Sequence, residues 1–140
     1  MPKKSRLRSA SPLLPSASTT LASPSRRPSR QRGYSSRWDK ASAAFKRKHP
    51  LCLGCEAAGR VEATTTTDHV VPHKGNARLM WDEANLQPAC TWHHSTVKQA
   101  LEWRFEAGEI DTPDLRLDSP TALELAARLI AEGRGPGAKG

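Results

Sequence analysis

Two pairs of metal-binding residue types, far apart in the sequence, constrain the fold of this chain more than any other feature. Cys52 and Cys55 form a Cys-x-x-Cys pair, and Cys90 and His93 form a Cys-x-x-His pair after an interval of 34 residues. Thiolate and imidazole groups at such spacings are typical ligands of tetrahedral zinc. The chain has three cysteines, so internal disulfides would leave one thiol over. The spacing therefore predicts one structural zinc ion that joins the two pairs.

Two other interpretations of Cys52 and Cys55 stay open at this point. A redox-active pair normally lies at the start of a helix in a thioredoxin-like βαβ unit, and the sequence shows no such pattern. Buried thiols can also pack as small inert apolar groups. The second pair, in a chain otherwise free of cysteine, favours a metal site over both alternatives.

The composition explains why a metal would matter to this fold. The chain has 140 residues, and aromatic residues make up 5% of it. A small ordered region with few large apolar side chains gains little free energy from burial and usually needs a metal or a disulfide to stabilise it. We therefore expect a small α+β domain stapled by zinc and flanked by helices.

The positive charge is concentrated near the N-terminus. The net charge is +8, yet residues 1–37 hold nine of the 22 Lys and Arg residues and no Asp or Glu. Residues 1–31 are rich in Ser, Pro and Arg, which predicts a disordered basic tail. Such a tail suggests a polyanionic partner such as nucleic acid. A solvated tail and an organellar transit peptide are the alternatives, although five prolines argue against an amphipathic import helix.

Periodicity predicts the main elements of the remaining chain. A helix is expected from Ser36 to about residue 48, with Trp38 and Phe45 on its buried face and Pro50 beyond its end. Residues 51–60 should form a turn, the Thr-rich run 61–71 a strand, and 72–84 a loop.

The C-terminal third should be mostly helical. A helix is expected from about Thr91 to Gly108, with Val97, Leu101 and Phe105 facing the core. A short helix over 121–132 should present Leu123, Ala127 and Ile130 on one side. Three parts result: the tail 1–31, a domain 32–108, and a C-terminal extension 109–140 that carries the short helix.

Four residues between and beside the two cysteine pairs complete a known pattern. Asp68 and His69 are followed after 15 residues by Asn85, and after eight more by His94. With the cysteine pairs and the stretches "DHVVPHKG" and "NLQ", residues 32–98 resemble the zinc-stapled HNH endonucleases of the kind encoded beside packaging genes in phages. The resemblance implies a ββα-metal finger, in which two strands and a helix hold one catalytic divalent cation.

The resemblance also implies a role for each of these residues. His69 would be the general base that takes a proton from water, a task that suits an imidazole at cellular pH. Asp68 and His94 would bind the catalytic cation, which would be Mg²⁺, Mn²⁺ or another divalent ion. Asn85 would either fix the backbone that holds His69 or add an oxygen ligand. Substrate DNA would be cleaved by hydrolysis of a phosphodiester bond.

The chain departs from the family pattern at one ligand. The usual fourth cysteine is replaced by His93, and imidazole is an accepted zinc ligand. Because adjacent helix residues diverge by about 100°, His93 and His94 should face different metals, and their roles could be exchanged. His73 and Lys98 are candidates for contact with the substrate. A surface histidine and a solvated lysine are the alternatives.

The resemblance further implies DNA as partner, with a phage terminase and portal as possible associates in packaging. It implies the cytoplasm of a bacterial or phage-infected cell as the location. No apolar run is long enough to cross a bilayer, so no membrane partner is expected. The alternative function is a zinc-ribbon module that binds nucleic acid without catalysis, although such a module leaves Asp68, His69, Asn85 and His94 unexplained.

Overall fold

A short antiparallel pair of strands lies between two groups of helices. The computed structural model describes residues 35–137, so the tail predicted over 1–31 lies outside the described residues. The chain divides after Ser35, and the second unit holds every element named below. These elements are the helices α1 (Ser36–Lys48), α2 (Leu53–Ala57), α3 (Ala77–Trp81), α4 (Lys98–Glu106) and α5 (Pro120–Ala131), the strands β1 (Thr66–His69) and β2 (Leu86–Ala89), a π-helical segment (His93–Val97), and 3-10 turns at Glu83–Asn85 and Thr112–Leu115.

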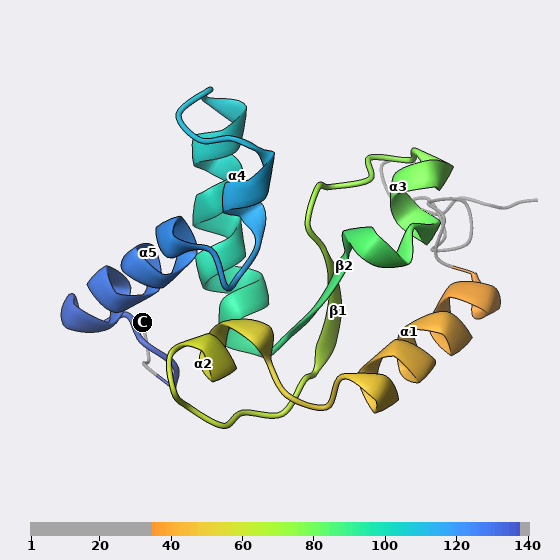
Figure 1. Ribbon diagram of the computed structural model, residues 1–140, viewed down its shortest axis with the longest axis horizontal. Helices are drawn as coiled ribbons and strands as arrows, with labels where there is room; N and C mark the ends of the chain where they lie inside the picture. The colour runs from red at the N-terminus through yellow and green to blue at the C-terminus, as the bar shows by residue number, and fades with distance from the viewer. Residues whose placement is uncertain (1–34, 138–140) are drawn as a thin grey trace, which may run out of the picture. The chain divides into compact units, whose positions relative to one another are not determined.

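The two strands hold the centre of the described unit. Thr66 pairs with Ala89 and His69 with Leu86, in antiparallel register. Figure 1 shows α1 and α3 on one side of this pair and α4 and α5 on the other. The described residues thus form a small mixed α+β fold, as the sequence predicts.

Helix α1 has the buried face that its periodicity predicts. Trp38 and Phe45 are its buried residues, while three cations, Lys46 to Lys48, occupy its last turn. Cations are favoured there because the carbonyl end of a helix carries partial negative charge. The residues on the buried face turn toward β1 and anchor the helix against the sheet.

The predicted strand over 61–71 is shorter than expected. Only Thr66–His69 belongs to β1. The residues before it pair with the segment that leads into α2 instead, since the amide of Cys52 donates to the carbonyl of Glu62 and the amide of Thr64 donates to the carbonyl of Pro50. This pairing holds the first cysteine pair against the base of the sheet.

The loop predicted over 72–84 was wrong in part, because it contains α3 and a 3-10 turn. Asn76 caps α3, its side-chain oxygen accepting from the amides of Arg78 and Leu79. Asp82 caps the turn in the same way through Ala84. Asn and Asp are favoured caps because their oxygens satisfy amides that have no partner within the helix. Each element is too short to show a helical period in the sequence.

The helix predicted from Thr91 to Gly108 is present, with an irregular beginning. Its first full turn is π-helical over His93–Val97, where the amide of Lys98 bonds the carbonyl of His93. Val97 and Leu101 are fully buried, as predicted. Gly108 ends the helix at φ 79°, a left-handed conformation that suits glycine.

Helix α5 begins as predicted but buries a different face. Ser119 caps it by accepting from the amide of Ala122, and Pro120 occupies the first turn. Leu125 and Leu129 are buried, whereas Ile130 is 40% exposed. The stripe of Leu123, Ala127 and Ile130, which the sequence places on one side of the helix, is therefore not the buried face. Apolar residues lie on both sides of this helix, and the side that contains Leu125 and Leu129 packs against the core.

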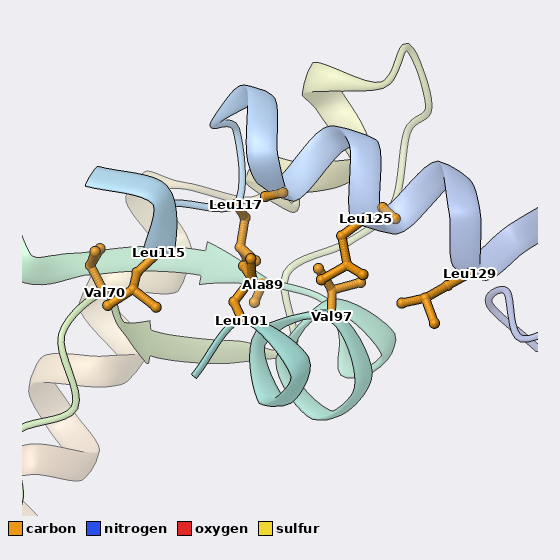
Figure 2. Close-up of a cluster of buried hydrophobic side chains, with 10 residues drawn as sticks. Val70, Ala89, Val97, Leu101, Leu115, Leu117, Leu125 and Leu129 are labelled. Atoms are coloured by element: carbon orange, nitrogen blue, oxygen red, sulfur yellow. The ribbon is translucent and has the colours of Figure 1, made fainter. Parts of the chain in front are cut away.

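The main hydrophobic core lies between α4, α5 and one face of the strands. Figure 2 shows Leu115 beside Val70, Leu117 above Ala89 and Leu101, and Leu125 of α5 above Val97. Its buried members are Val70, Ala89, Val97, Leu101, Leu115, Leu117, Ala122, Leu125, Ala126 and Leu129. Within the described part of the chain, no helix combines the length and apolar character needed to cross a bilayer.

Candidate functional site

The four predicted metal ligands meet in one buried cluster. Cys52 precedes α2 and Cys55 lies within it, while Cys90 follows β2 and His93 begins the π-helical segment. Their ligand atoms all lie within 4.8 Å of one another. Two distant stretches of chain therefore supply two ligands each, and the four residues could hold a metal ion such as zinc.

The distances within the cluster match those between ligands of a tetrahedral zinc ion. The Nδ1 atom of His93 lies 3.5 Å from each of the three sulfur atoms, and the sulfur atoms of Cys55 and Cys90 are 3.8 Å apart. Zinc bonds of about 2.3 Å to sulfur and about 2.0 Å to nitrogen imply tetrahedral edges of about 3.8 and 3.5 Å. The side chains are thus arranged around a point that suits this ion.

Burial opposes a shared negative charge on the three thiols. It raises the pKa of the Cys55 thiol to about 12, and the neighbouring charge of Cys52 adds to this effect. Burial also acts to raise the pKa of Cys52, but its hydrogen bonds with His93 and with the backbone of Cys55 and Cys90 together lower it to about 6. A metal cation favours the thiolate form of such ligands. Arg60 adds a positive charge nearby, its guanidinium donating to the Cys55 sulfur at 3.8 Å.

Gly54 is a part of this cluster that the sequence does not single out. A β-carbon at this position would lie 2.3 Å from Nε2 of His93. The imidazole therefore packs directly against the backbone of α2. The middle of a Cys-x-x-Cys pair is variable in general, so only the folded position of His93 identifies this glycine as required.

Asp68 is the centre of a second, adjacent group of polar side chains. It is 4% exposed. Its Oδ1 atom lies 2.9 Å from Nδ1 of His94, and its Oδ2 atom lies 3.1 Å from Nζ of Lys98. The Nε2 atom of Gln87 donates to the same Oδ2 at 2.9 Å. The structure thus brings Asp68 and His94 together, as the predicted cation site requires.

The charges in this group stabilise one another. Burial acts to raise the pKa of Asp68, but the hydrogen bond from His94, the charge of Lys98 and the hydrogen bond from Gln87 together lower it. The hydrogen bond to Asp68 raises the pKa of His94. Gln87 carries no signal of this role in the sequence alone. The signal for it is its place opposite Asp68 in the strand register, which appears only once the strands are paired.

Lys98 lies in the interior and not at an exposed position suited to substrate contact. Its side chain is 1% exposed. The ammonium group donates to the carbonyl of His69 at 2.6 Å and to Glu102 at 2.8 Å, besides its contact with Asp68. The solvated lysine considered as the alternative is excluded by this burial.

His69 turns to the opposite side of β1 from Asp68. Its Nε2 atom is 3.1 Å from the carbonyl of Met80, to which it can donate. Its ring stacks on Trp38, with centroids 5.1 Å apart, and meets the edge of the His73 ring at 4.8 Å. Burial lowers the pKa of His69, so the neutral imidazole is favoured at neutral pH.

Asn85 fixes the backbone around His69. Its Oδ1 atom accepts from the amide of Val71, and its Nδ2 atom donates to the carbonyls of Val71 and Leu79. These contacts tie the chain after β1 to α3, which carries Met80. Of the two roles considered for Asn85, the contacts of its amide agree with the backbone role.

His73 lies at the edge of the same region. Its Nδ1 atom accepts from the amide of Gly75, which bends the loop. This hydrogen bond and the ring contact with His69 place His73 beside the general-base candidate. The sequence motif "PHKG" therefore contributes local loop structure next to His69.

A groove of about 500 Å³ is lined by none of the candidate ligands themselves. Its lining includes Phe45, His49, Leu53, Glu83 and Arg116. Gln87 reaches both this groove and Asp68. Comparison with known proteins adds no further assignment, since no family model, curated protein or solved structure matches the chain.

Proposed function

We propose that this protein is a metal-dependent endonuclease of the HNH type, which hydrolyses phosphodiester bonds in DNA. The observation that carries the proposal is the contact between the buried Asp68 and His94. His69, the next residue of β1, is half-buried, and its lowered pKa favours the neutral imidazole. The sequence resemblance given above supplies the reaction, and the ββα-metal interpretation of β1, β2 and the helix after them belongs to this proposal.

His69 is suited to act as the general base. Because its Nε2 atom can donate to the carbonyl of Met80, its Nδ1 atom is left as the proton acceptor. A lowered pKa keeps that nitrogen unprotonated at neutral pH. His69 would take a proton from a water molecule whose oxygen forms the new bond to phosphorus, while the bond from phosphorus to the leaving oxygen breaks.

The other residues hold this base and the substrate in place. Trp38 and Asn85 orient the His69 ring and its backbone. Asp68 and His94 would hold the divalent cation, which when bound supplies positive charge to the phosphate oxygens. The four-residue cluster of Cys52, Cys55, Cys90 and His93 would hold zinc as a structural ion and fix the start of the helix that carries His94.

A nucleic-acid-binding zinc module without catalysis is the second candidate. One observation favours it: Lys98 already neutralises Asp68, as a purely structural carboxylate would require. Both candidates bind DNA, so binding alone does not distinguish them.

Cleavage of supercoiled plasmid in Mg²⁺ or Mn²⁺ separates the two candidates. We expect nicking or linearisation by the full chain. His69→Ala should reduce it by about 10²–10⁴-fold, the usual contribution of a general base, while DNA binding is retained. The exposed His49, whose ring packs on Phe45 outside this region, provides the matched control His49→Ala. The proposal fails if the wild type is inactive with every cation, or if His69→Ala cleaves as fast as His49→Ala.

A further inference from the structure

The most unusual charged group in the described residues is the buried ammonium of Lys98. At 1% exposure it is among the largest fully buried side chains. A buried lysine needs anionic or carbonyl partners, because removal from water disfavours the charged form. Lys98 has three: the carboxylates of Asp68 and Glu102 and the carbonyl of His69.

Asp68 and His94 themselves fit a divalent cation. Their atoms Oδ1 and Nδ1 lie 2.9 Å apart. Adjacent ligands on an octahedral ion with bonds of about 2.1 Å are separated by about 3 Å. The side chain of His94 is 47% exposed, so water can reach this edge and complete the coordination. The second oxygen of Asp68 faces inward to Lys98.

We propose that Lys98 is an internal cation that competes with a divalent metal ion for Asp68 and so sets how tightly that ion binds. The inference rests on the proposed function for the identity of the competing ion. Lys98 with Asp68 and Glu102 carries a net formal charge of −1, and removal of the lysine charge leaves −2. The added negative charge favours a dication, because charges interact strongly where little solvent intervenes.

The same geometry makes Lys98 a positioning residue. Its ammonium donates to the carbonyl of His69 while contacting the carboxylate of Asp68, so it holds the end of β1 against α4. A lysine with only a structural role would hold β1 against α4 without affecting the affinity for the cation. Removal of the lysine charge therefore changes the cation affinity only if Lys98 competes with the cation.

The test is Mn²⁺ binding to the zinc-loaded full chain, measured by electron paramagnetic resonance. We expect Lys98→Met to bind Mn²⁺ about tenfold more tightly than wild type, or better. Lys74→Met is the matched control, because Lys74 pairs with Glu106 at 3.0 Å on the surface and its loss changes the net charge equally. Adding Asp68→Asn to Lys98→Met should abolish the gain. Equal affinities of Lys98→Met and Lys74→Met would overturn the proposal.

A measurement on the wild-type protein covers the case in which Lys98→Met does not fold. Mg²⁺ titration followed by nuclear magnetic resonance should shift the Lys98 Nζ signal and the His94 ring signals with the same midpoint. A shift of His94 without Lys98, or no shift of either, contradicts competition.

Cleavage is scored separately from this binding. If Lys98→Met binds Mn²⁺ more tightly but the wild type does not cleave DNA, only the proposed nuclease activity is wrong. If the wild type cleaves DNA but Lys98→Met does not change the affinity for Mn²⁺, only this inference is wrong.

Discussion

Among the described glycines, Gly54 has the least room for a side chain. The His93 ring occupies the space that any side chain at this position would need. Gly54→Ala should displace the ring, release zinc and lower stability by about 1–3 kcal/mol or more, as overpacked interiors do. The measurements are zinc content and the melting temperature.

Gly59 provides the control for this substitution. It lies in the same turn region at φ 84°, and a β-carbon there would meet no atom within 4 Å. Gly59→Ala should strain the backbone by about 1 kcal/mol but keep the metal. Retention of zinc and of the wild-type melting temperature by Gly54→Ala would show that the ring does not need this space.

The adjacent histidines should fail in different ways. His93 contacts the three thiols, whereas His94 contacts Asp68. His93→Cys restores a thiolate ligand, and we expect it to keep zinc, fold and cleavage. His94→Ala should keep zinc and fold but lose metal-dependent cleavage, because one ligand of the proposed catalytic cation is gone.

Zinc content and plasmid nicking, measured on both purified variants, check this prediction. Cys52→Ser serves as the control for a true loss of zinc. Loss of zinc from His94→Ala, with His93→Cys losing only activity, would reverse the two assignments.

At the level of residues, the four members of the cysteine cluster were predictable from the sequence, but the residues that pack against the candidate ligands were not. Cys52, Cys55, Cys90 and His93 were predictable because their spacing is a local property of the chain. Gly54, Gln87 and the burial of Lys98 were not, since each depends on which strand or helix packs opposite. The ionic partners of Asp68 become visible only when β1, β2 and α4 are assembled.

Among the elements, α5 shows where periodicity stops being informative. Its start was predictable from Ser119 and Pro120, which act locally. Its buried stripe was not, because Leu123 and Ile130 are as apolar as Leu125 and Leu129. The surface offered by α4 and by Leu115 and Leu117 decides between them (Figure 2).

Truncation of two leucine-sized residues on α5 tests this choice of face. Leu125 is 7% exposed, and its change to Ala should lower the free energy of unfolding by about 2–5 kcal/mol. Ile130→Ala, on the exposed side, should cost far less. Urea unfolding of both variants is the measurement, and a larger loss for Ile130→Ala would show that the stripe containing Ile130 is the buried face.

No local sequence pattern predicted the π-helical segment. A helix from Thr91 was predictable, but the wider turn at His93–Val97 was not. Such segments are often found at functional sites. Here it begins at a ligand of the cysteine cluster and ends immediately before Lys98, so it spans the interval between the two groups of candidate ligands.

For the whole molecule, the uneven charge of the sequence predicts how the proposed binding of DNA depends on salt. Nine Lys and Arg residues lie in residues 1–37. Deletion of residues 1–30 should flatten the dependence of DNA affinity on salt, by up to about 0.9 in log–log slope for each phosphate that the shortened chain no longer neutralises. Fluorescence anisotropy at several salt concentrations measures the slope. An identical slope in the truncated and full chains would show that these charges do not bind DNA.

The α+β class was predictable at this scale, and the resemblance implied two strands, but the lengths of the strands and their register were not predictable. Helices can be predicted from the spacing of their apolar residues and from their capping residues, but four-residue strands depend on pairing with a distant segment. The pairing of β1 with β2 joins residues that neither neighbouring sequence nor composition brings together.

The cysteine cluster also has a consequence for the order in which the chain is made. Its two pairs of residues are separated in the sequence by a stretch that contains β1, α3 and β2. A nascent chain that has not reached His93 can offer a metal only the thiols of an incomplete set, and those thiols are exposed to oxidation in the meantime. Binding of a metal ion by all four residues would therefore require that both strands have been synthesised. A pause in translation before residue 93 should leave a nascent chain whose thiols can be oxidised and whose two strands are not yet paired.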